Sequence, residues 1–339
     1  MMLRWYGLML GAVVSTLGCV ATPPATVETS LVVPTQPLAY VRNHQVMVAA
    51  QNGTQAQLIS LPTDVAFAPV FIDGGQSVLY VVQQGDFYEL WRYQLATAQR
   101  QLLIALRHQP QQLAVSPNDT FMAYIANDIL YVFNLTTQKQ VRIHEGVYSL
   151  AWSPTGKQLV FVTNDNRLLL QSLTVTSQLD QPTTLREGEI ITWPIWLDNT
   201  TLVYEGVWEE AITLLRYDIA DASVIPITSL RFSATVPAAG IQLAPDGATI
   251  AYIRPDDITE LPNVWIVPLN QDAPKLILTN AYTPIWNPTS DGLLYIESTV
   301  EPSIFSVTAT GLDKTELISG GHSMVTPVQY HSNPFTISS

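Results

Sequence analysis

Histidine is the residue type in this sequence whose spacing could build a metal site. Four of its five histidines, His44, His108, His144 and His322, fall in or near expected turns, and the last three precede recurring apolar or aromatic positions by seven or eight residues. Imidazole is a common ligand of zinc and other transition metals. If these positions converged, they would support a metal-dependent lyase or hydrolase acting on an extracellular polymer. No His-x-His or His-x-x-x-His pair strengthens this alternative.

Acidic loops with aromatic residues offer a different chemistry, that of binding. Aromatic and arginine side chains on a polar background are typical of protein recognition surfaces. We therefore predict a surface that binds a protein, peptide or glycan, with a solvated acidic surface as the open alternative. Its candidate residues are Glu187, Glu189, Glu205, Trp208, Glu209, Glu210, Arg231, Phe232, Arg254, Asp256 and Asp257.

No catalytic residue or cofactor is predicted from the remaining motifs. The adjacent acids Glu209–Glu210 and Asp256–Asp257 would point apart in an extended chain, so they do not predict an acid/base pair. The sequence contains no Gly-x-Ser-x-Gly elbow and no Gly-x-x-x-x-Gly-Lys phosphate loop. Its 28 acidic residues outnumber 15 basic ones, for a net charge of −13, which argues against a nucleic-acid partner. The single cysteine excludes an internal disulfide framework.

The N-terminal segment is typical of export. One basic residue, Arg4, precedes an apolar run and small residues that end at Cys19. Thr16-Leu17-Gly18-Cys19 resembles the lipoprotein signal-peptidase site, although Thr16 stands where leucine is usual. We predict a lipoprotein signal peptide over residues 1–18 and lipidation of Cys19, with an ordinary cleaved signal or a short uncleaved anchor as alternatives.

Residues 19–36 are rich in Pro, Thr and Ala and show no hydrophobic periodicity. Such a segment favours an extended tether. Together with the acylated N-terminus, it predicts an extracytoplasmic protein, lipid-anchored to a bacterial cell membrane or outer membrane. The expected partners are the lipid bilayer and an envelope protein or peptide.

A repeat of six units, each combining an apolar or aromatic anchor, a turn and a buried aromatic, determines the expected fold. Successive anchors are 37 to 47 residues apart, and an aromatic follows each after eight or nine residues. Turn residues such as Ser153-Pro154-Thr155-Gly156 separate the two positions. This period fits four-stranded propeller blades, whose recurrent aromatics would fill the space between blades. The anchors are Phe71, Val115, Trp152, Trp196, Leu243 and Trp286.

The two ends of the chain supply one more blade. Leu38-Ala39-Tyr40-Val41 matches the second strands of the repeats but has no first strand before it. Thr326-Pro327-Val328-Gln329 matches the first strand Thr283-Pro284-Ile285-Trp286. The sequence thus predicts an all-β, seven-bladed β-propeller over residues 37–334, closed by N- and C-terminal strands that share one blade.

These repeats resemble the TolB-like and WD-repeat-like β-propellers, whose units read roughly Pro-x-Trp-Ser-Pro-Asp-Gly followed by an apolar strand. The resemblance covers nearly all of residues 37–334 and implies the propeller fold. TolB itself carries an α/β domain before its propeller, whereas only the short tether precedes it here. Since such propellers host both binding and catalysis, the resemblance leaves the function open.

Overall fold

The computed structural model describes residues 37–173, 180–209, 211–227, 239–255, 259, 261–270, 273–297, 303–319 and 325–330. These residues form seven four-stranded antiparallel sheets and one short 3-10 turn, η1 (Asp73–Gly75). In this part of the chain, no helix is long and apolar enough to cross a membrane. The predicted all-β class is confirmed.

The strands follow the expected repeat, four to a blade. Blade 1 contains β4 (Val65–Ile72), β5 (Ser77–Gln84), β6 (Phe87–Gln94) and β7 (Gln99–Leu106). Blade 2 contains β8 (Pro110–Val115), β9 (Phe121–Ala126), β10 (Ile129–Asn134) and β11 (Gln140–Glu145). Blade 3 contains β12 (Val147–Trp152), β13 (Gln158–Thr163), β14 (Arg167–Ser172) and β15 (Thr183–Glu187). Blade 4 contains β16 (Ile191–Trp196), β17 (Thr201–Trp208), β18 (Ala211–Asp218) and β19 (Val224–Pro226). Blade 5 contains β20 (Ala239–Leu243), β21 (Thr249–Pro255), β22 (Pro262–Pro268) and β23 (Lys275–Leu278). Blade 6 contains β24 (Ala281–Trp286), β25 (Gly292–Glu297), β26 (Ile304–Thr308) and β27 (Thr315–Ile318).

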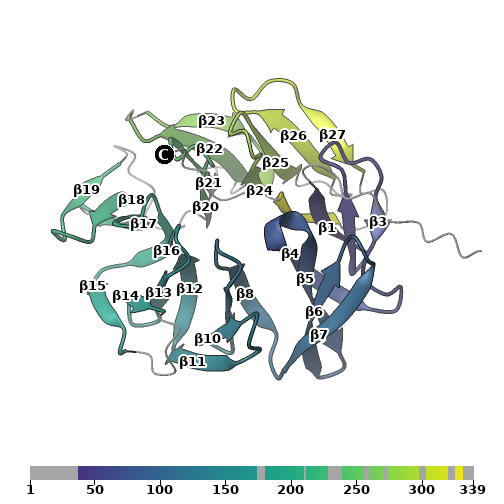
Figure 1. Cartoon of the computed structure of the whole chain (residues 1–339). Coiled ribbons are helices and arrows are strands. Elements are labelled where there is room, and N and C mark those ends of the chain that lie inside the picture. The colour runs from purple at the N-terminus through teal and green to yellow at the C-terminus, as the bar shows by residue number, and fades with distance from the viewer. Residues whose placement is uncertain are drawn as a thin grey trace, which may run out of the picture. The chain divides into compact units, whose positions relative to one another are not determined.

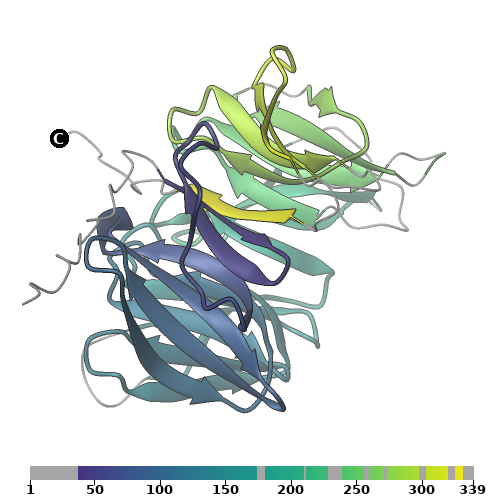
Figure 2. The same ribbon diagram turned by 90° about the vertical axis from the view of Figure 1, so that its right-hand side faces the viewer.

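The remaining blade, which we call the shared blade, joins both ends of the chain. It contains, in spatial order, β28 (Val325–Tyr330), β1 (Leu38–Arg42), β2 (Gln45–Ala49) and β3 (Gln57–Leu58). Leu38 pairs with Tyr330 and Arg42 pairs with Val325, so β1 and β28 run antiparallel. Figure 2 shows the yellow strand β28 beside the purple strand β1. The predicted closure of the propeller by both ends is confirmed.

The first strands of the blades form the inner wall of a closed ring. Each contacts its successor, in the order β4, β8, β12, β16, β20, β24 and β28, and β28 returns to β4 (Figure 1). Each blade then extends outward through its second, third and fourth strands. Within each sheet the edge strands are the first, which contacts the first strands of its neighbours, and the outermost fourth.

Antiparallel pairing gives the ring two faces that differ in the strand connections they carry. On one, which we call the turn face, first strands turn into second strands and third into fourth. The opposite loop face holds the turns between second and third strands and every connection from one blade to the next. Both chain ends leave from the turn face, because Leu38 and Tyr330 lie at the ends of their strands away from the β1–β2 turn.

Turn residues at the turn face link neighbouring blades as well as reversing the chain. The Gly74 amide donates to Asp119 Oδ2 at 3.2 Å, and the Asp246 amide donates to Ser290 Oγ at 3.0 Å. Gly156 has φ +66°, a conformation that glycine adopts without the steric cost of a side chain. These turns therefore help to fix the spacing of the blades.

The recurrent aromatic residues form the core between blades. The indole Nε1 of Trp152 donates to Ala114 O at 3.0 Å, and that of Trp196 donates to Ala151 O at 3.1 Å, each on the first strand of the preceding blade. The tyrosine series is buried as well; its fully buried members are Tyr40, Tyr80, Tyr204, Tyr252 and Tyr295. Their repeated placement assigns these residues to packing.

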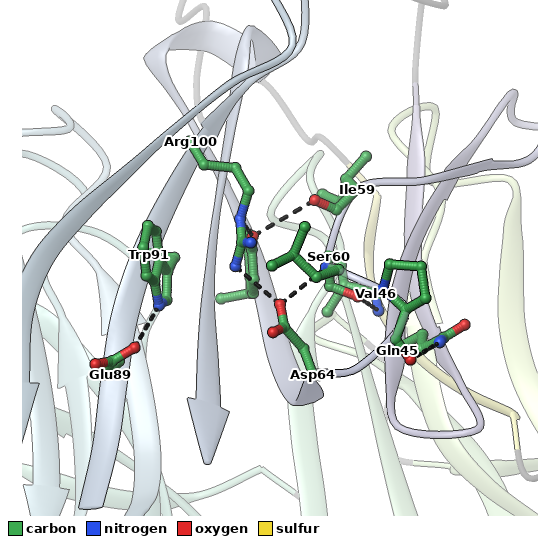
Figure 3. Close-up of polar contacts among 11 residues, drawn as sticks. Gln45, Val46, Ile59, Ser60, Asp64, Glu89, Trp91 and Arg100 are labelled. Carbon is green, nitrogen blue, oxygen red and sulfur yellow. Dashed lines mark hydrogen bonds and ion pairs between the residues drawn. The ribbon is translucent and has the colours of Figure 1, made fainter. Parts of the chain in front are cut away.

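A partly buried ion pair fixes the connection from the shared blade to blade 1 (Figure 3). Arg100 donates to Asp64 Oδ2 at 2.8 Å and to the Tyr80 hydroxyl at 2.7 Å. Its guanidinium also lies 4.4 Å from the centre of the Trp91 ring. Asp64 accepts a second bond, from the Leu61 amide at 2.8 Å. Burial raises the pKa of Tyr80 to about 12, so its hydroxyl remains neutral and available to Arg100 at physiological pH.

Candidate functional site

Exposed large apolar side chains of the described residues gather on the loop face. Those outside it lie on outer strands or, for Leu312, in a turn of the turn face. Blade 4 carries three of them, Ile190, Trp193 and Trp208, which are 45%, 38% and 37% exposed. We call these three residues the blade-4 patch. The other members on the loop face are Leu61, Val65, Phe87, Leu261 and Tyr282.

Strand pairing places Ile190 and Trp208 at the same end of blade 4. Ile191 pairs with Gly206, so Ile190, one residue earlier, lies beside the end of β17 that carries Trp208. Trp208 itself pairs with Ala211 where β17 turns into β18. Continuing this register would place Ile190 opposite Val207, the residue before Trp208. The two exposed side chains therefore lie at the same end of blade 4 without being direct cross-strand neighbours.

Trp193 occupies a backbone position at which the other blades have smaller residues. The residues three positions before the other anchors are Ala68, Gln112, Ser149, Gly240 and Thr283. At Trp193 the pairing between β16 and β17 shifts register, and φ is +47°. Ala68 and Thr283 share the positive φ, at +50° and +48°, so the bulge itself is a repeated feature. A bulky residue in this conformation is strained, but the conformation belongs to the repeat, and what distinguishes blade 4 is the size of the side chain there.

Our sequence interpretation missed Trp193, although the repeat alignment contained the signal. It treated tryptophans in the repeats as core residues, which is correct for Trp196, three positions later and 5% exposed. Comparing every blade at the position of Trp193 would have shown that only this blade has a large side chain there.

A charged cluster lies in the connection from blade 3 to blade 4. Arg186 donates to Glu189 Oε1 at 2.6 and 3.0 Å through two guanidinium nitrogens. The Tyr204 hydroxyl donates to the same oxygen at 3.2 Å, which ties this connection to β17 of blade 4. Glu189 is thus a paired structural carboxylate, whereas it was predicted as part of the binding surface.

Glu205 does not lie on the exposed surface. We expected it in a loop, but it is a fully buried residue within β17 and accepts a bond from Thr192 Oγ1 at 2.6 Å. The following Gly206 suggested a turn, yet a Cβ there would lie 2.8 Å from side-chain atoms of Leu215 and Tyr204. Close packing therefore accounts for the glycine. Burial and then the Glu205 charge raise the pKa of nearby Tyr148 to about 12.

The other predicted binding residues are distributed as follows. Glu187 is exposed at the end of β15, Glu209 is exposed directly after Trp208, and Arg254 is partly buried in β21 of blade 5. Glu187 and Glu209 accompany the blade-4 patch on the loop face, as expected from the topology. Glu210, Arg231, Phe232, Asp256 and Asp257 lie outside the described residues.

The described histidines do not converge. His44 lies in the β1–β2 turn, His108 between β7 and β8, and His144 in β11, so they belong to three different parts of the ring. Among the residues that the structure describes, no group of three His, Cys, Asp or Glu side chains could hold a metal ion. His322 lies outside the described residues. The metal-site hypothesis therefore gains no support from His44, His108 and His144.

His144 has a structural environment with a consequence for acid stability. Its ring centre lies 5.4 Å from that of Phe161. Burial and the Arg167 charge lower the pKa of His144, against the opposing charge of Asp165. The folded state thus favours the neutral ring, and this stabilisation is present above about pH 6.5 and lost as pH falls below it.

We expect the melting temperature to fall between about pH 7.5 and about pH 5.5, and His144→Gln to reduce that fall. Thermal denaturation followed by circular dichroism at both pH values measures it. An unchanged pH dependence in His144→Gln would contradict the role of this ring, and His108→Gln, at an exposed position, serves as the control.

A comparison with protein families decides the classification. The sequence profile of the NUP159/214 β-propeller matches residues 33–213, more than half of the chain. The chain belongs to the NUP159/214 β-propeller family. The matched part of this family member runs from the start of the shared blade into β18 of blade 4. No curated protein sequence matches the chain.

Solved structures show the same fold in proteins of different function. TolB from Acinetobacter baumannii is 15% identical, with a TM-score of 0.56 over 83% of this chain and 77% of TolB. An oligogalacturonate lyase from Vibrio parahaemolyticus is 11% identical, with a TM-score of 0.60 over 83% of this chain and 85% of the lyase. An oligogalacturonate lyase in complex with manganese, also 11% identical, has a TM-score of 0.62 over 84% and 86%. This NUP159/214-family chain is therefore a TolB-like β-propeller, and the shared fold does not determine its activity.

Proposed function

We propose that this protein is a membrane-tethered extracytoplasmic binding module that recognises an envelope protein or peptide through the blade-4 patch. The observation that carries the proposal is the exposure of Ile190, Trp193 and Trp208 together on one blade. Tryptophan is enriched among the residues that contribute most to protein binding.

The membrane attachment in this proposal rests on the sequence. Residues 1–18 would be the signal peptide, Cys19 the acylated residue and residues 19–36 the tether, all outside the described residues. Acyl chains acting together hold a protein stably at a bilayer, whereas one chain anchors it only marginally. The chain enters the propeller at Leu38, on the turn face. This arrangement would leave the blade-4 patch on the face opposite the root of the tether.

Crosslinked affinity capture from native membranes, using the full-length protein, tests the proposal. Trp193→Ala should reduce recovery of the specific partner about 30-fold, as expected for loss of about 2 kcal/mol at a central contact. Phe87→Ala is the matched control, since it removes an exposed loop-face aromatic of blade 1. Cys19→Ala should move the protein out of the membrane fraction.

Two results would count against the proposal. Equal partner recovery by Trp193→Ala and the unaltered protein would show that the patch does not bind. A stoichiometric metal in the purified protein, together with turnover of an anionic polysaccharide, would instead favour the lyase or hydrolase alternative.

A further inference from the structure

We infer that the shared blade binds a small monovalent anion, of the size of chloride, between Tyr40 and Arg42 on the side of β1 that faces blade 6. The inference is independent of the blade-4 patch and concerns the closure of the ring. Among the described residues, the buried Tyr40 hydroxyl and the buried Nε of Arg42 have no hydrogen-bond partner. Both groups can donate a hydrogen bond, so one anion that accepts from both would satisfy them.

The two side chains converge on the same short stretch of blade 6. Tyr40 and Arg42 lie two residues apart on β1, so their side chains leave the same face of the strand. Tyr40 packs in one cluster with Leu294 and Ile318 of blade 6. A terminal guanidinium nitrogen of Arg42 donates to the carbonyl of Ser319, the residue after Ile318. The hydroxyl and the guanidinium are therefore held together where blade 6 meets the shared blade.

The charge at this place favours an anion over a neutral molecule. Arg42 is partly buried, and in the part of the chain that the structure describes it contacts the Ser319 carbonyl but no carboxylate. Removing a guanidinium from water without a counterion is costly. Burial raises the pKa of Tyr40 and the Arg42 charge opposes this shift, so the two groups interact while the hydroxyl keeps its proton at physiological pH.

Blade 1 shows what completes such a pair elsewhere in the ring. Tyr80 occupies in blade 1 the repeat position that Tyr40 occupies in the shared blade. The Tyr80 hydroxyl accepts from Arg100, and Arg100 pairs with the Asp64 carboxylate at 2.8 Å (Figure 3). Blade 1 thus combines a buried tyrosine, an arginine and an acid.

Blade 4 repeats this combination. Tyr204 donates to Glu189, and Glu189 pairs with Arg186 at 2.6 Å. The shared blade has the tyrosine and the arginine, but no acid of the described residues joins them. A bound anion would take the place of the carboxylate, and it must be small because Tyr40 is fully buried.

The test compares melting temperatures of the full-length protein in detergent in about 0.3 M NaCl and about 0.3 M sodium gluconate, which match in ionic strength. Gluconate is too large to enter between packed blades. An anion that binds only the folded state should raise the melting temperature in chloride by about 2–4 °C. Tyr40→Phe and Arg42→Met should each remove this difference. In gluconate, Tyr40→Phe should not lower the melting temperature, because it deletes a buried hydroxyl that has no acceptor there.

Tyr80→Phe is the matched control, because the Tyr80 hydroxyl has Arg100 as a partner within the protein. It should lower the melting temperature in both salts and keep the difference between them. Arg107→Met, at an exposed arginine after β7, controls for the general effect of removing a positive charge.

Three results would overturn the inference. The first is an equal melting temperature of the unaltered protein in the two salts. The second is a chloride-dependent rise that persists in Tyr40→Phe or in Arg42→Met. The third is a lower melting temperature of Tyr40→Phe by the same amount in both salts, which would assign the place between Tyr40 and Arg42 to a water molecule.

Discussion

Replacing Trp196 by alanine is expected to lower the free energy of unfolding by about 3–5 kcal/mol, the range for a buried tryptophan. The side chain packs between blades 3 and 4 with Val160, Val162 and Tyr204. Its Nε1 also donates to Ala151 O at 3.1 Å, so the substitution leaves that carbonyl without its indole partner. Urea denaturation followed by far-ultraviolet circular dichroism measures the loss independently of tryptophan fluorescence.

Trp193→Ala provides the matched control for this prediction. The two tryptophans lie three residues apart on β16, but Trp193 is 38% exposed and occupies a strained conformation. We expect its replacement to change the unfolding free energy by about 1 kcal/mol or less while removing partner capture. If Trp193→Ala were as destabilising as Trp196→Ala, Trp193 would be a packing residue and the binding site would lie elsewhere.

Gly53→Ala should strongly lower the free energy of unfolding, because Gly53 lies where the shared blade meets blade 6. Gly53 lies between β2 and β3 with φ +79°, and a Cβ built there would be 2.2 Å from Leu317 O in blade 6. The left-handed conformation alone costs an alanine about 1–2 kcal/mol. Because the obstacle is backbone rather than a flexible side chain, the two blades must also move apart. We expect a total destabilisation of about 3 kcal/mol or more, measured by the same urea denaturation.

Gly85→Ala separates the cost of the left-handed conformation from the cost of the close backbone contact. Gly85 lies in the β5–β6 turn with φ +60°, and a Cβ there would meet no atom within 4 Å. We expect Gly85→Ala to lose only this conformational cost, about 1–2 kcal/mol of the unfolding free energy. Equal losses of unfolding free energy in Gly53→Ala and Gly85→Ala would show that the close contact with Leu317 adds nothing to the cost of the Gly53 substitution.

The fold was predictable because each blade repeats the same physical solution. Apolar first strands, turns with Gly or Asp, and a buried aromatic eight or nine residues after each anchor recur in register, and the structure confirms them. The pairing of β1 with β28 could be predicted because each end lacked the strand that the other supplied. Repetition thus replaced the long-range information that a single sequence usually lacks.

The candidate site could be predicted only in part, because it depends on departures from that repetition. Glu187, Trp208 and Glu209 were identified from unusual loop sequence and lie on the loop face. Glu205 was misplaced because β17 spans eight residues, two more than β9 or β13, and so includes a glycine that elsewhere would indicate a turn. Trp193 was missed because tryptophans in the repeats were all assigned to the core, although only blade 4 has a large residue at that position.

The shared blade also constrains the order in which the protein can fold. Leu38, at the start of the first described strand, finds its partner Tyr330 only at the end of the last one, so this pairing cannot form until the chain has been synthesised through Tyr330. Contacts of such long sequence separation form slowly. Until then β1 presents an open edge to other extended chains. The newly made chain is therefore most vulnerable to aggregation and proteolysis before β28 pairs with β1.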